Sequence, residues 1–176
     1  MKLSDLFEDL NINQLHQNIQ RGFPKTKKRQ HVTHEVNVNN IHFKIDTNQK
    51  ILSINANTST SGTGNKHTPM LALKDVNFQA PQSGQNVEIQ GADGQKQSIT
   101  PVKLNINNVM VACDCEDYIK RFAPYNVQNN CHLGQPPAPY TRKTTTYPEV
   151  NPKHLPGMCK HIIKIVEVLK QKHILI

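Results

Sequence analysis

Three cysteines and one histidine in the last third of the 176-residue chain have the types and spacing of a zinc site. One residue separates Cys113 from Cys115, one separates Cys159 from His161, and 43 residues lie between the two pairs. Structural zinc takes four thiolate or imidazole ligands in a tetrahedron. A Cys-x-Cys pair at a bend after a strand and a Cys-x-His pair in the first turn of a helix can direct all four ligands at one ion. We therefore expect these four residues to bind one structural Zn²⁺.

The segment between the two pairs leaves the ligand set open. Cys131 or His132 could replace His161, and Cys131 could instead complete an all-cysteine site. His154 is a weaker candidate near the second pair. Each candidate also has a simpler interpretation. Cys131 would be a partly buried thiol in a loop, and His154 would be an exposed histidine. The four residues above would be buried cysteine pairs with no special role.

The two pairs together resemble the SWIM zinc-finger family, whose signature is Cys-x-Cys, a variable gap and Cys-x-His. The matching strings are VACDCEDY and GMCKHIIKIVEVL, and the resemblance covers about residues 109–170. A lysine between the last two ligands and an apolar helix after them are also typical of that family. The resemblance implies a zinc module that binds DNA or a protein partner. The 43-residue gap is longer than in many members, so the content of the loop stays open.

A narrower resemblance is to a family of tailed-bacteriophage virion proteins with a SWIM-like site. The strings are CEDYIKRFAPYN and PPAPYTRKTTTYPEVNPKHLPGMCKH. They are similar to that family's Cys-x-Cys-x-Asp-Tyr/Phe-x-x-Arg-Phe and Asn-Pro-x-x-x-Pro-Gly-x-Cys-Lys-His segments. The resemblance implies a small structural component of the particle and does not say which part. We expect a structural or adaptor role in the neck, tail or baseplate region, with other virion proteins as partners. The resemblance also implies that the protein is located in the virion, which is assembled in the host cytoplasm. The alternative location is the cytoplasm itself.

No catalytic constellation accompanies the site. Four ligands fill a tetrahedral shell, whereas catalytic zinc keeps an open position. The chain contains no His-Glu-x-x-His motif and no recognisable nucleophile motif. Asp114, Glu116 and Asp117 are expected to be charges at the N-terminus of a short helix, where the helix dipole favours them. We expect a protein that is not an enzyme and takes no small-molecule substrate.

A strand and two helices must position the ligands. The run Val109–Ala112 predicts a buried strand leading into Cys113, and residues 116–122 predict a short helix. Prolines indicate a loop over residues 123–156, which a metal would close. The last helix is expected to begin near Gly157. Its apolar stripe would comprise Met158, Ile162, Ile165, Val166 and Leu169.

The preceding residues predict one helix and then strands. Helical spacing of apolar residues favours a helix over residues 2–20, capped by Ser4 and followed by a basic linker. That linker carries Lys25, Lys27, Lys28 and Arg29. Alternation in residues 41–45 predicts a strand with Ile41, Phe43 and Ile45 on one face.

Turn residues divide the strand region into hairpins. Residues 46–50 predict a hairpin loop, and the polar residues 55–69 predict an exposed loop. A second hairpin is expected over residues 86–104, with Pro101 at an edge or bulge. The fold class is therefore α+β: an N-terminal helix, β-hairpins and a zinc-stapled strand–loop–helix module. We expect a helix and basic linker over 1–28, a β-rich region over 29–106 and a SWIM-like module over 107–176.

Composition indicates a thin core and polyanionic or protein partners. Only 36% of residues are hydrophobic and 5% aromatic, so the core needs a metal, an oligomer or a permanent partner. The net charge of +8 favours DNA, RNA or acidic protein surfaces. We expect contacts to acidic neighbours or DNA from Lys120, Arg121, Arg142 and Lys143.

The sequence gives no sign of export or of a membrane partner. No stretch approaches the ~20 apolar residues of a membrane helix, and acids interrupt the apolar residues at the N-terminus, so it does not read as a signal peptide. We therefore expect the four cysteines to be reduced thiols rather than disulfides.

Overall fold

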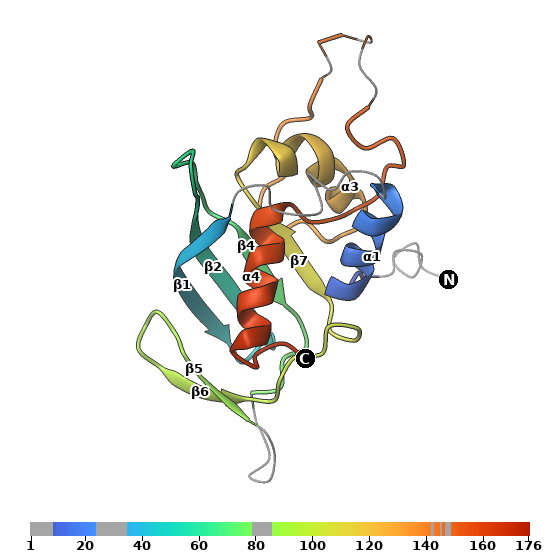
Figure 1. Ribbon diagram of the computed structural model, residues 1–176. Coiled ribbons are helices and arrows are strands. Elements are labelled where there is room, and N and C mark those ends of the chain that lie inside the picture. The colour runs from blue at the N-terminus through green and yellow to red at the C-terminus, as the bar shows by residue number, and fades with distance from the viewer. Residues whose placement is uncertain (1–8, 24–34, 79–85, 142, 145, 147–148) are drawn as a thin grey trace, which may run out of the picture.

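The computed structural model describes residues 9–23, 35–78, 86–141, 143–144, 146 and 149–176. Helices pack around an antiparallel sheet, and a separate two-stranded hairpin lies beside it (Figure 1). The predicted α+β class is confirmed: an N-terminal helix, antiparallel hairpins, and a C-terminal helix next to the cysteine cluster.

The main sheet has the strand order β1-β2-β4-β7, and β3 adds a short pairing to β2. Its strands are β1 (Val36–Asp46), β2 (Ile51–Thr60), β3 (Lys66–His67), β4 (Met70–Leu73) and β7 (Val109–Ala112). All neighbours are antiparallel. The turn between β1 and β2 falls at residues 47–50, as predicted, and Ile41, Phe43 and Ile45 pack partly buried against the core. The predicted strand into Cys113 is β7.

The Ser/Thr-rich segment that was expected to be an exposed loop is largely strand. β2 continues through Thr60, and Ala56, Thr58 and Thr60 are buried while Asn55 and Asn57 are exposed. The expectation was wrong because polar composition concealed a period of two, and threonine fits a half-buried pleated surface well. After a turn at residues 61–65, β3 returns along β2.

The second predicted hairpin is present as β5 (Val87–Gln90) and β6 (Lys96–Ile99). Its return strand is shorter than expected, because β6 ends before Pro101, which lacks a backbone N–H to donate. Ile89 and Ile99 are buried, and the Ala92 N–H donates to the Phe43 carbonyl at 2.8 Å. The hairpin is thereby joined to the edge of β1.

The N-terminal helix is shorter than predicted. α1 spans Ile12–Gly22, and Leu10, expected inside the helix, precedes it. Asn11 begins the helix with a capping box, in which Asn11 and Gln14 each accept from the other's backbone N–H at 2.9 Å. The predicted Ser4 cap and the basic linker at residues 25–29 lie outside the described residues.

The helix after the first cysteine pair runs further than predicted. Residues 116–117 are helical, a π-helical turn follows at Tyr118–Phe122, and α3 continues over Ala123–Gln128. The loop expected from residue 123 therefore begins after α3. Pro124 stands where the π-helical turn passes into α3, and it has no backbone N–H to donate to the preceding turn.

The last helix, α4, spans Lys160–Gln171 and begins three residues after the expected Gly157. All five residues of the predicted apolar stripe are buried: Met158, Ile162, Ile165, Val166 and Leu169. In Figure 1, α4 lies across one face of the sheet and α1 stands beside β7. One cluster of buried residues includes members from α1, the sheet, the β5–β6 hairpin and α4. None of the helices among the described residues has the length and apolar character to span a bilayer.

A buried asparagine joins α3 to the segment that precedes α4. The Asn126 side chain donates to the Gly157 carbonyl at 3.0 Å and accepts from the Gly157 N–H at 2.9 Å. It also donates to the Tyr118 hydroxyl at 3.1 Å. A Cβ on Gly157 would lie 2.7 Å from the Phe122 ring, so only glycine allows this close approach. The contact fixes the backbone two residues before Cys159.

Asn151 makes a second cross-link of the same kind. Its side-chain amide donates to the carbonyls of Arg121 at 2.9 Å and Leu155 at 2.8 Å. Its oxygen accepts from the Leu155 N–H at 3.2 Å. The long proline-rich segment is therefore held by buried hydrogen bonds on its C-terminal side, independently of any metal.

Replacing Asn126 with alanine should destabilise the chain strongly. Both buried backbone groups of Gly157 would lose their partner, which costs about 2–4 kcal/mol in free energy of unfolding. Urea denaturation measures that loss, and Gln128→Ala is the matched control, since Gln128 is exposed at the end of the same helix. Equal, small losses in both variants would contradict the cross-link.

Candidate metal centre

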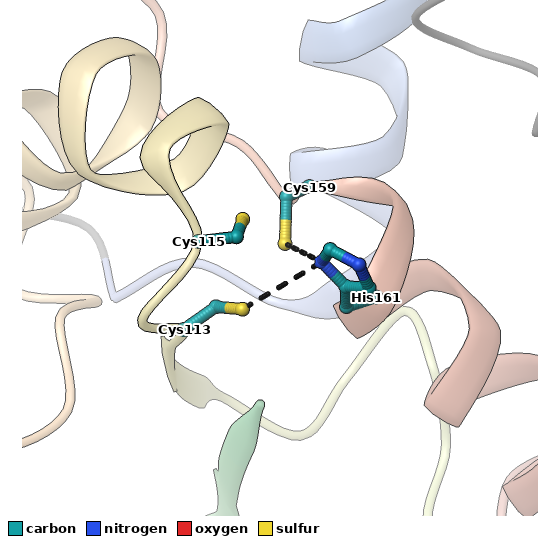
Figure 2. A group of neighbouring side chains, drawn as sticks. All are labelled: Cys113, Cys115, Cys159 and His161. Carbon is teal, nitrogen blue, oxygen red and sulfur yellow. Dashed lines mark hydrogen bonds between the residues drawn. The ribbon is translucent and has the colours of Figure 1, made fainter. Parts of the chain in front are cut away.

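Cys113, Cys115, Cys159 and His161 come from the ends of two elements. Cys113 follows β7 directly, and Cys115 begins the helical segment, where its sulfur accepts from the Tyr118 N–H at 3.4 Å. Cys159 is the N-terminal cap of α4, and His161 lies in the first turn of that helix. Figure 2 shows the four side chains converging, two from the turn after β7 and two from the start of α4.

The geometry of the four ligand atoms matches a tetrahedral cation. All four lie within 4.8 Å of one another. Nδ1 of His161 is 3.9 Å from the sulfurs of both Cys113 and Cys159. Two ligands that each lie about 2.0–2.3 Å from a tetrahedral zinc are about 3.5–3.8 Å apart. Small movements of the side chains would therefore bring all four atoms to bonding distance of one ion.

The site is closed to solvent, which suits a structural cation. The exposed fractions are 5% for Cys113, 4% for Cys115, 1% for Cys159 and 2% for His161. All four cysteines of the chain are free thiols, as expected for reduced cysteines. Three sulfurs and one imidazole nitrogen form a soft donor set that zinc prefers. The residues present therefore fit zinc in both number and chemistry.

The electrostatics of the cluster favour a positive ion at its centre. A hydrogen bond from Cys113, followed by one from Cys159, lowers the pKa of the Cys115 thiol. The hydrogen bond with Cys115 raises the pKa of Cys113, and burial raises that of Cys159. Protein groups alone thus favour the thiolate form of Cys115 and disfavour the thiolate forms of Cys113 and Cys159. A cation that binds thiolates would remove this opposition and release the protons.

The alternative ligands lie outside the cluster. The Cys131 thiol is buried and donates to the Asn126 carbonyl at 3.5 Å, and burial raises its pKa to about 12. Nδ1 of His132 lies 2.9 Å from the Tyr118 hydroxyl. His154 is exposed and pairs with Glu149 at 3.0 Å. The structure thus brings together the four residues first expected, and Cys131, His132 and His154 are not part of the cluster.

Arg121 is not the surface cation that the sequence suggested. Its guanidinium pairs with Asp117 at 2.9 Å, and the residue is only 5% exposed. The group also lies over the rings of Phe23 and Phe122, at 5.0 and 5.7 Å from their centroids. The guanidinium therefore packs between the end of α1 and the π-helical turn. Arg142 lies outside the described residues, whereas Lys120 and Lys143 border a pocket with Tyr125 and Tyr140.

Two residues beside the cluster escaped the sequence analysis. Asp114 was expected to be a helix-terminal charge, but its carboxylate accepts from the Thr68 N–H at 3.0 Å and lies 3.1 Å from Nδ1 of His67. The His67 ring in turn packs on His161, with ring centroids 4.4 Å apart. His67 belongs to a segment expected to be a loop, so no local signal placed it here. The predicted charges at Glu116 and Asp117 do stand at the start of the helical segment.

Comparison with protein-family models, curated proteins and solved structures finds no match to this chain. The structure thus shows a buried cluster that could hold a metal ion, compatible with a zinc finger, on an α+β fold.

Proposed function

We propose that Cys113, Cys115, Cys159 and His161 bind one structural Zn²⁺ that stabilises the C-terminal part of the chain. The observation that carries this proposal is the burial of three thiols and one imidazole within 4.8 Å of one another. Four protein ligands leave no open coordination position, which supports a structural ion and a protein that is not an enzyme. When bound, the ion would supply a cross-link between the turn after β7 and the start of α4.

The size of the metal contribution explains why the ion matters for folding. Structural zinc contributes on the order of 10–16 kcal/mol of apparent binding free energy in small peptides. A whole domain is typically stable by only about 5–15 kcal/mol. The ion would therefore decide whether residues 109–170 fold, since they contain both ligand pairs and the long segment between them.

The substitutions Cys113→Ser and Cys159→Ser should each abolish zinc binding and unfold residues 109–170. Native mass spectrometry of reduced protein measures the bound zinc, and thermal melting with and without chelator measures the stability. Cys131→Ser is the matched control, because Cys131 is a buried thiol outside the cluster and its loss should leave zinc bound. A Cys113→Ser chain that melts in the presence of chelator with the profile of the zinc-loaded wild type would contradict the proposal.

We further propose that the chain is a structural or adaptor component of a tailed-phage virion, in the neck, tail or baseplate region. The two motif-bearing strings carry this proposal through their resemblance to phage virion proteins. Two features of the surface support the proposal that the chain binds neighbouring virion proteins. Residues 134–141 extend away from the body (Figure 1), and Tyr140 at their end is 40% exposed.

The edge of the sheet also supports docking to another protein. β1 is an 11-residue edge strand, and on its outer side the described residues pair only at the bridge between Phe43 and Gly91. A long open edge favours addition of a strand from a partner. A neighbouring virion subunit would cover this edge and bury further surface of the chain.

Particles of the phage that encodes the chain should contain it at fixed stoichiometry together with zinc. Quantitative mass spectrometry of salt-washed particles measures the stoichiometry, and cross-linking identifies the neighbours. Particles emptied of DNA are the control, since a component held by protein contacts stays bound to them. A chain that is abundant in infected cells but absent from washed particles would overturn the virion role.

The alternative is a SWIM-type zinc module that binds DNA or a regulatory protein partner, which the net charge of +8 favours. Phosphate binding loses affinity steeply as salt rises, because each phosphate contact releases a counterion. A steep salt dependence of duplex or single-strand binding by the zinc-loaded chain would support that alternative. A flat response would remove it.

A further inference from the structure

We propose that His67 and Asp114 are positioning residues of the metal centre: Asp114 orients the Cys113–Cys115 turn, and His67 orients the His161 ring and shields it from water. This inference rests on the zinc site proposed above. Neither residue is among the four ligands, and His67 comes from a different part of the chain. The proposal makes the β2–β3 hairpin a third support of the site, beside β7 and α4.

Asp114 fixes the backbone between the two cysteine ligands. Its Oδ1 accepts from the Thr68 N–H at 3.0 Å and lies 3.1 Å from Nδ1 of His67. A carboxylate only accepts hydrogen bonds, so His67 donates from Nδ1. The same oxygen lies 3.8 Å from the Cys113 sulfur. A residue at the centre of Cys-x-Cys is thus held by two donors of the hairpin, which fixes the direction of both neighbouring thiols.

The His161 ring needs support that its own hydrogen bonds do not give. Nδ1 faces the sulfurs of Cys113 and Cys159, while Nε2 is buried and has no hydrogen-bond partner among the described residues. A metal-ligating histidine is usually oriented by a hydrogen bond at its second nitrogen. Packing must supply that orientation here, and the His67 ring lies against His161 with centroids 4.4 Å apart and planes inclined by 45°.

His67 is itself fixed by the sheet, so it can transmit order to the site. Its backbone pairs with Thr58 of β2, and the Thr58 hydroxyl donates to the His67 carbonyl at 3.0 Å. Thr58 is 1% exposed, whereas the His67 side chain is 24% exposed. His67 therefore lies at the boundary between solvent and the buried His161. Its removal would both loosen the ligand ring and admit water to the site.

Three variants separate orientation from shielding. His67→Ala removes both effects. Asp114→Ala removes the oxygen that accepts from Thr68 and His67. His67→Phe keeps a ring over His161 without the N–H donor. The matched control is His154→Ala, because His154 and Glu149 form another histidine–carboxylate pair at 3.0 Å outside the cluster. Circular dichroism of the zinc-saturated variants establishes that each is folded.

Zinc affinity is measured by competition with a chelator of known affinity, and zinc release by transfer to excess chelator. Loss of such supporting contacts weakens metal binding about 10–100-fold. We expect that loss, with faster release, for His67→Ala and Asp114→Ala, a smaller loss for His67→Phe and no change for His154→Ala. Absorption of the Co²⁺-substituted chain should also shift in His67→Ala, because the geometry at the ion changes while the ligands remain.

The outcomes distinguish this inference from the site on which it rests. Wild-type affinity, release rate and Co²⁺ spectrum in His67→Ala and Asp114→Ala would overturn the positioning role while leaving the zinc site intact. An equal loss in His154→Ala would also overturn it, because the effect would then not depend on proximity to the cluster. A wild-type chain that retains no zinc under reducing conditions would overturn both proposals.

Discussion

Three buried sulfurs and a buried imidazole nitrogen meet within 4.8 Å, in a place where water reaches none of the four residues freely. Burial and neighbouring thiols raise the pKa of Cys113 and of Cys159, so without a cation these two residues favour the neutral thiol over the thiolate that binds metal. One soft cation would resolve this conflict and join two elements that lie 43 residues apart along the chain. The arrangement of the C-terminal part follows from that single junction.

Contacts elsewhere in the C-terminal part of the chain hold the three cysteines and His161 in one arrangement. Asn126 and Asn151 hold the proline-rich segment with buried hydrogen bonds, and the absence of a side chain at Gly157 lets the backbone pass against Phe122 just before Cys159. On the other side, the β2–β3 hairpin reaches the site through His67 and Asp114. A cation between these supports would contribute the largest single stabilising term, and the hydrogen bonds would fix the geometry in which it binds.

The sequence predicted what depends on local spacing and missed what depends on distant partners. The four residues of the cluster, the strand before Cys113, the two hairpins and the apolar stripe of α4 follow from motifs and periodicity within a few residues. The strand character of residues 55–60 was hidden because buried threonines look like loop composition until neighbouring strands cover them. His67 could not be placed, since its partner Asp114 is 47 residues away, and Arg121 resembled a surface cation because its ring contacts with Phe23 are long-range.

X-ray absorption at the zinc edge of freshly purified, reduced protein shows whether a zinc ion is bound by three sulfur ligands and one nitrogen ligand. We expect one zinc per chain, with three scatterers at the Zn–S distance of about 2.3 Å and one nitrogen at about 2.0–2.1 Å. A spectrum dominated by oxygen ligands, or a folded chain that contains no zinc, would contradict this expectation.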